Sequence, residues 1–150
     1  MSAPHGIDFY FDFACPYAYL ASTRLEELAA HTGGAIHLKP VLLGGIFRAL
    51  KQPQNMSTTL SPAKARHNRL DLLRWASWLD VPLQTPIRHP NRSVEALRHV
   101  LATPAEAALK VVHNFYALYW AESGDISDPK VLHQRLLDLG LDADAIAAAS

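Results

Sequence analysis

The sequence predicts an α/β fold that starts with a β-α-β unit and continues with helices. Residues 7–13 alternate in side-chain character and are rich in aromatic residues, which is typical of a strand. Residues 17–32 carry apolar side chains at helical spacing, and Gly33 and Gly34 favour the end of a helix there. A second apolar run follows at residues 35–43. A helical crossover between two strands predicts that the strands are parallel.

The sequence changes character after this second strand. Residues 44–62 are irregular and polar, and we predict a loop over a site. We therefore divide the chain into an N-terminal β-α-β unit over residues 1–45 and a region over residues 46–150 that holds the loop and the helices. Because a two-stranded sheet supports a domain poorly, more strand is expected after residue 150.

Helices are predicted through most of the remaining chain. Three of them are expected to begin at a capping side chain followed by proline, at Ser61, Thr103 and Asp128, and Asp142 is expected to cap a last short helix. The apolar stripe of the first of these helices is expected to face the core through Leu70, Leu73, Ala76 (or Trp75) and Leu79. A later aromatic group is also predicted to lie in the core: Tyr116, Tyr119 and Trp120.

The composition excludes several classes of protein. The chain has 150 residues with 14 basic and 14 acidic side chains, so it lacks the basic excess of a nucleic-acid-binding protein. No apolar stretch approaches the length of about 18 residues that a membrane span needs. The eight histidines are scattered and predict no metal site. The N-terminus does not resemble a signal peptide, and the single cysteine favours the cytoplasm.

That cysteine, Cys15, lies between the first strand and the following helix, and Pro16 suits the first helical position. A helix N-terminus stabilises an anion, so it would favour a thiolate at Cys15 or the thiolate of a ligand beside it. From position alone, a role as a small buried hydrophobic residue is equally open.

The segment FYFDFACPYAYLA resembles the opening of the thioredoxin-like DsbA superfamily. More narrowly, it is similar to the 2-hydroxychromene-2-carboxylate isomerase and kappa-class glutathione transferase family. The chain has Cys15 where that family usually has its active-site serine. The blocks LKPVLLGGIFRAL, AKARHNRLDLLRWASWLDVPLQTP and DISDP also resemble the family, so the likeness covers essentially the whole chain. The matching positions of the first block are Phe11, Asp12, Pro16, Tyr17, Tyr19 and Leu20.

This resemblance implies a thioredoxin-like fold with a large helical insertion, whose C-terminal strands and helix are absent from this chain. It implies glutathione as cofactor, a small aromatic carboxylate as substrate and glutathione-dependent isomerisation as the reaction. An open strand edge further favours a homodimer.

The resemblance also implies roles for individual residues. The sulfur of glutathione is expected near Cys15, with Lys64 and, on a weaker local match, Asn55 holding the tripeptide. Asp71 matches a family acid and shares a helix face with Lys64, two turns away. The residues expected to contact the substrate are Tyr17, His67 and Trp75.

Alternatives remain open at this point. Ala18 stands where a Cys-x-x-Cys motif would have its second cysteine, which excludes an intrachain dithiol cycle. A glutathione transferase or a monothiol DsbA-like oxidoreductase using Cys15 remains possible, as does a truncated, non-catalytic binding or oligomerising member. A small basic cluster of Arg88, His89 and Arg92 could meet an acidic substrate such as a carboxylate, but an ordinary surface position is the favoured interpretation.

Overall fold

The structure is a computed structural model that describes residues 6–53 and 55–150. Its elements are, in chain order, β1 (Gly6–Phe11), α1 (Pro16–Ser22), α2 (Leu25–Thr32), β2 (Ala35–Pro40), α3 (Leu43–Ala49), the 3-10 turn η1 (Met56–Thr59), α4 (Pro62–Trp78), α5 (Val94–Ala102), α6 (Ala105–Tyr116), the π-helical turn η2 (Ala117–Ala121), α7 (Pro129–Asp138) and α8 (Ala143–Ala149). The predicted α/β class, with a β-α-β start followed by helices, is confirmed.

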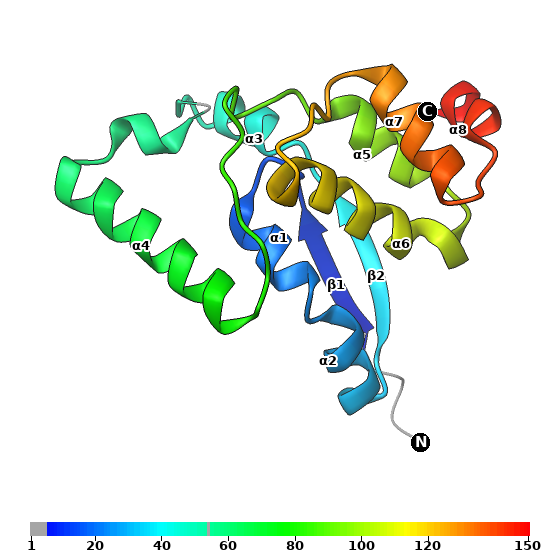
Figure 1. The fold of residues 1–150 in the computed structure, drawn as a ribbon, viewed down its shortest axis with the longest axis horizontal. Coiled ribbons are helices and arrows are strands. Elements are labelled where there is room, and N and C mark those ends of the chain that lie inside the picture. Colours follow the sequence, from blue (N-terminus) through cyan, green and yellow to red (C-terminus); the bar gives the residue numbers. More distant parts are fainter. Residues whose placement is uncertain (1–5, 54) are drawn as a thin grey trace.

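The two strands pair in parallel, from Gly6 opposite Ala35 to Phe11 opposite Pro40. Helices α1 and α2 form the crossover between them and lie beside the strands in Figure 1. The predicted parallel arrangement is therefore confirmed, and the site that follows β1 lies at the carboxyl end of both strands.

The predicted single helix over residues 17–32 is in fact two helices. The Ser22 hydroxyl donates to the Tyr19 carbonyl at 2.7 Å, and the Thr23 hydroxyl donates to the Leu20 carbonyl at 2.7 Å. Such side-chain bonds to the preceding turn compete with a regular helix. Helix α1 consequently has only seven residues, and the chain starts α2 at Leu25.

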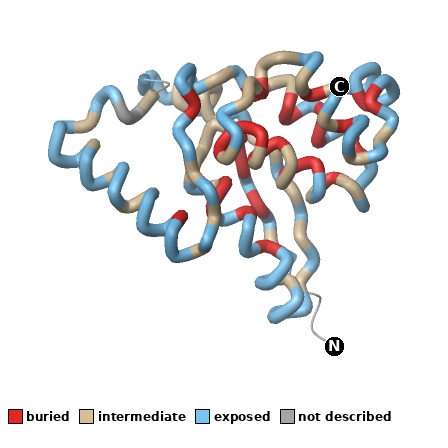
Figure 2. The backbone as a smooth tube through the Cα atoms, viewed as in Figure 1, coloured by how far each residue is buried: buried red, intermediate tan, exposed pale blue. Residues whose placement is uncertain are grey.

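The core forms where β1 meets α6 and η2. Phe13 is buried and lies 4.9 Å from Tyr116, measured between ring centroids. The Trp120 indole N–H donates to the Phe13 carbonyl at 2.8 Å, which fixes η2 to the end of β1. Buried backbone in Figure 2 concentrates in β1 and in the helices from α5 onward. The prediction that Tyr116, Tyr119 and Trp120 lie in the core is confirmed.

The prediction of an irregular loop over residues 44–62 was wrong. The segment contains α3 and η1. Two glycines near the start of α3 weaken its helical propensity, but the first N–H of the helix, on Leu43, donates to the buried Asp12 carboxylate at 2.7 Å. This tertiary contact, which the local sequence does not encode, anchors the helix.

Most predicted helix caps are confirmed. The Ser61 and Asp128 side chains each accept an N–H from the first turn of the helix that follows. The Thr103 cap was wrong, because its hydroxyl donates to the His99 carbonyl at 2.7 Å and therefore closes α5 instead of opening α6.

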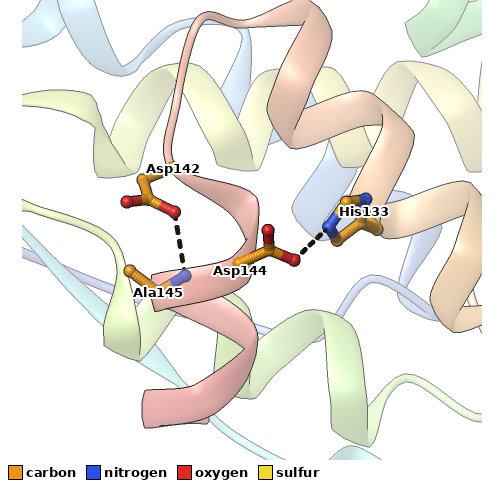
Figure 3. Close-up of polar contacts among 4 residues, drawn as sticks. All are labelled: His133, Asp142, Asp144 and Ala145. Carbon is orange, nitrogen blue, oxygen red and sulfur yellow. Dashed lines mark hydrogen bonds and ion pairs between the residues drawn. The ribbon is translucent and has the colours of Figure 1, made fainter.

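A polar corner joins the last two helices (Figure 3). Asp142 caps α8 as predicted, accepting from the Ala145 N–H at 3.0 Å. His133 of α7 lies 3.0 Å from the Asp144 carboxylate. Both contacts are exposed, so they orient α8 on α7 while the buried Ile146 supplies the apolar packing.

Helix α4 stands to one side of the other elements (Figure 1). Its predicted core stripe is only partly correct, because Ala76 is buried and Leu79 half-buried, whereas Leu70 and Leu73 are 39% and 44% exposed. The helix packs on α1 along a narrow line, so one face of it is left to line a cavity. Among the described residues, no helix has the length and apolar character needed to cross a membrane.

Replacing Trp120 tests the junction between β1 and η2. We expect Trp120→Phe to lower the free energy of unfolding by about 2–3 kcal/mol, because it removes a buried hydrogen bond and part of a packed ring. Trp78→Phe, at a side chain that is 71% exposed, is the matched control and should change stability by less than about 0.5 kcal/mol. Urea unfolding followed by circular dichroism measures both, and equal losses would contradict the assignment.

Candidate active site

Cys15 lies in the turn between β1 and α1. It is the N-cap residue of α1, and its own N–H donates to the Asp12 carbonyl at 2.9 Å. Its half-buried side chain makes no capping hydrogen bond. Among the described residues, the N–H groups of Tyr17 and Ala18 have no acceptor, as expected in the first turn of a helix. The turn therefore presents a thiol and free backbone donors together. Because α1 has only seven residues, its dipole is smaller than that of the single longer helix predicted over residues 17–32.

Asp12 organises this turn from below. Its side chain is buried at 2% exposure. One carboxylate oxygen accepts from the Ala14 N–H at 2.9 Å, and the other accepts from the Leu43 N–H at 2.7 Å. The Asp12 carbonyl also accepts from the Tyr116 hydroxyl at 3.1 Å. A single residue thus ties the Cys15 turn to both α3 and the core.

A cavity of about 1260 Å³ opens above Cys15. Its walls come from the segment after β2 with α3, from α4, and from the connection between α4 and α5. The lining is mainly apolar with a few polar groups, which is typical of small-molecule sites. The polar side chains that line it are Cys15, Tyr17, Arg48, Asn55, Asn68, Arg69, Thr85, His89, Asn91, Arg92 and Ser93, with Asp12 beneath.

Tyr17 connects the Cys15 turn to α4. Its hydroxyl lies 2.7 Å from the Asn68 side-chain oxygen and 3.0 Å from an Asp71 carboxylate oxygen. Burial raises the pKa of Tyr17 above its usual value, and the hydrogen bond to Asp71 and the Asp71 charge raise it further. The phenol therefore stays protonated and donates towards α4.

His89 lies on the opposite wall. The Asn91 N–H donates to the Tyr119 oxygen at 2.9 Å, so the Tyr119 hydroxyl proton is free to donate to Nδ1 of His89, 3.0 Å away. Burial lowers the pKa of His89 below its usual value. Burial thus disfavours the charged form, and a neutral His89 that accepts from Tyr119 at Nδ1 would carry its proton on Nε2.

The structure brings together only some of the residues expected at the site. Cys15, Tyr17 and Asn55 line the cavity. The other four predicted residues lie on α4 outside the lining: Lys64, His67, Asp71 and Trp75. Of these, Asp71 is connected to the site through Tyr17, whereas the others are exposed. The binding roles of all seven stay predictions.

The sequence reasoning missed the face of α4 that does line the cavity. This face consists of Ala65, Asn68, Arg69, Leu72 and Leu73, which recur at helical spacing. That spacing was visible in the sequence, but Leu73 was assigned to the core stripe. Among the described residues, no group of acidic, histidine or cysteine side chains could hold a metal ion.

Comparisons with known proteins agree with this geometry. A family model described as DSBA-like thioredoxin domain matches residues 6–150. A 2-hydroxychromene-2-carboxylate isomerase from Sphingobium xenophagum is 32% identical over 142 residues, which is 93% of this chain and 71% of that protein. Glutathione S-transferase kappa 1 from Caenorhabditis elegans is 35% identical over 81 residues, 53% of this chain and 34% of the transferase. A solved 2-hydroxychromene-2-carboxylate isomerase superposes with a TM-score of 0.76 at 28% identity, covering 94% of this chain and 68% of that one.

Removing one Asp12 acceptor should loosen the Cys15 turn. We expect Asp12→Asn to lower the free energy of unfolding by about 2–3 kcal/mol, because an amide accepts through one oxygen and leaves one N–H unpaired. Asp8→Asn, at an exposed carboxylate paired with His37, is the control and should cost under about 1 kcal/mol. Denaturant unfolding measures both; a loss in Asp12→Asn no larger than in the control would contradict the role of Asp12.

The Tyr17–Asp71 contact can be tested by titration. We expect Asp71→Asn to lower the pKa of Tyr17 but to leave it above 10.0, because burial, the larger cause, remains. NMR titration of the Tyr17 ring, assigned by its loss in Tyr17→Phe, gives the value. Asp80→Asn, just beyond the same helix, is the control. An unchanged Tyr17 pKa in Asp71→Asn would show that the contact does not exist in solution.

Proposed function

The chain belongs to the DSBA-like thioredoxin domain family, and from this premise we propose that it is a glutathione-dependent isomerase of the 2-hydroxychromene-2-carboxylate type. The observation that carries the proposal is the position of Cys15, at the start of α1 and on the floor of a large, mainly apolar cavity. A small aromatic carboxylate has the size and polarity that such a cavity accommodates.

The residues of the cavity suit glutathione, a tripeptide with two carboxylates. Three arginines and three asparagines line the same space, and the backbone donors of Tyr17 and Ala18 are free beside Cys15. We propose that Cys15 and Asn55 hold the cofactor directly, with Lys64 binding it from the exposed side of α4 and Asp71 acting through Tyr17. The bound tripeptide would supply a thiolate nucleophile.

The chain itself would orient that sulfur and protect the reacting atoms from water. The Cys15 thiol can donate a weak hydrogen bond where a serine hydroxyl would donate a stronger one. The free N–H groups of α1 add fixed dipoles at the same point. Tyr17 directs its hydroxyl proton to Asn68 and Asp71 of α4, so the phenol oxygen is left as an acceptor at the cavity edge. His67 and Trp75 lie on α4 outside the cavity lining. As substrate contacts, they would require a shift of α4 that brings them to the cavity.

A second function is favoured by one observation. Cys15 is a free, half-buried thiol that lines the cavity, so a glutathione transferase or a monothiol oxidoreductase could use it. In a monothiol reaction, the Cys15 thiolate would form a mixed disulfide with glutathione disulfide and release one glutathione thiolate.

We also propose that the chain works in the cytoplasm as a homodimer. The single cysteine is consistent with a reducing compartment. Across the part of the chain that the structure describes, β1 and β2 pair with each other alone, so each leaves a strand edge that a second copy could contact.

Substitution of Cys15 separates the two functions. We expect Cys15→Ser to keep glutathione-dependent isomerisation within about tenfold of the unmodified protein, because a hydroxyl replaces the thiol as donor. Cys15→Ala should lose about 10- to 100-fold, the effect of one missing hydrogen bond to a charged group. Conversion of 2-hydroxychromene-2-carboxylate, followed with and without glutathione, measures the rates.

Each result has a clear reading. No glutathione-dependent conversion by the unmodified protein would overturn the isomerase proposal. Loss of thiol–disulfide exchange in both variants, with no isomerisation in any form of the protein, would instead support the monothiol reaction.

A further inference from the structure

We propose that Arg69 is the residue that recognises the carboxylate of an aromatic substrate in this cavity. The inference rests on the proposed function for its substrate class, and it assigns the anion-binding contact to a residue of α4 that was given no role in the sequence analysis.

The position of Arg69 on α4 places it at the centre of the cavity-facing surface. Ala65 and Leu73, four residues before and after it, both line the cavity, and so do Asn68 and Leu72. On a helix, residues at these spacings share one face. The Arg69 side chain therefore extends from the middle of the α4 wall.

The charges of the lining leave Arg69 available to a ligand. The carboxylate of Asp12, the acidic residue of this lining, is occupied by two backbone N–H groups. Within the described residues, neither Arg69 nor Arg48 of α3 forms an ion pair or a side-chain hydrogen bond. A concave apolar surface with unpaired positive charge concentrates anions.

The small basic cluster near the connection between α4 and α5 is less available to a carboxylate than Arg69. Arg92 lines the cavity but lies 3.0 Å from the Glu95 carboxylate. Arg88 does not line the cavity, and its positive charge contributes, after hydrogen bonds from Ser127, to lowering the pKa of Asp125. Burial disfavours the charged form of His89. Arg69 is thus better placed to bind a carboxylate than any member of that cluster.

The neighbours of Arg69 favour an aromatic acid over the tripeptide cofactor. Leu72 and Leu73 flank it on the same wall and offer an apolar surface to a ring. A guanidinium group can bind a carboxylate through two parallel hydrogen bonds. Glutathione, which has a polar backbone, is better matched by the free N–H groups of Tyr17 and Ala18 beside Cys15.

Binding of naphthoate and its neutral analogue naphthamide to the full chain tests this assignment, by calorimetry and without any need for turnover. We expect Arg69→Gln to weaken naphthoate about 10- to 100-fold, the loss of a charge-assisted contact, and to change naphthamide by less than about twofold. Arg66→Gln, the same charge change on an exposed position of the same helix, should alter neither. Arg69→Lys should bind naphthoate with intermediate affinity, because lysine keeps the positive charge but lacks the two parallel N–H donors of the guanidinium group.

Equal weakening of both probes in Arg69→Gln would overturn the inference, as would an equal effect of Arg66→Gln. A loss of glutathione affinity in Arg69→Gln, with naphthoate unchanged, would assign Arg69 to the cofactor and overturn it too. If naphthoate binding depends on Arg69 as expected but the chain shows no isomerase activity, the result supports the anion-binding role of Arg69 and contradicts the proposed reaction.

Discussion

The buried carboxylate of Asp12 is the contact on which the site depends. A buried charge is costly unless hydrogen bonds satisfy it, and here two backbone N–H groups from different segments do so. Because one donor follows β1 and the other begins α3, the same carboxylate fixes the Cys15 turn and the wall opposite it. The carbonyl of Asp12 extends the connection to Tyr116 in the core. The position of the thiol is consequently set by the core.

The two sides of the cavity are built by different kinds of interaction. On the side of η2 and the connection before α5, aromatic rings pack closely: Trp120 lies 5.1 Å from both Tyr119 and His89, between ring centroids. On the side of α4, the contacts to α1 include the exposed hydrogen bonds of Tyr17. Buried packing of this kind contributes far more to stability than exposed polar contacts.

Much of the fold could be predicted from the sequence because it is encoded locally. The alternation from Ile7 to Phe11 and the cap at Asp142 depend on neighbouring residues alone, and both were correct, although the strand ends at Phe11 and not at Phe13 as predicted. The helix α3 was missed because its anchor, Asp12, lies far away in the sequence. For the same reason the burial of Asp12, expected on the polar face of the strand, could not be predicted. The motif around Cys15 was enough to predict the floor of the site from the sequence. The residues of α4 that face the cavity could be identified only once the orientation of that helix was known.

The difference between the two walls has a consequence for the range of molecules that the cavity accepts. Moving the aromatic wall would disrupt the core, whereas moving α4 would exchange the exposed hydrogen bonds of Tyr17 and disturb the smaller apolar contact around Ala76. Ligands of different width would be accommodated by displacement of the helix that carries Arg69. On this basis, the aromatic wall would set the shape of the ring that fits, and α4 would set the distance at which the positive charge of Arg69 meets the anion.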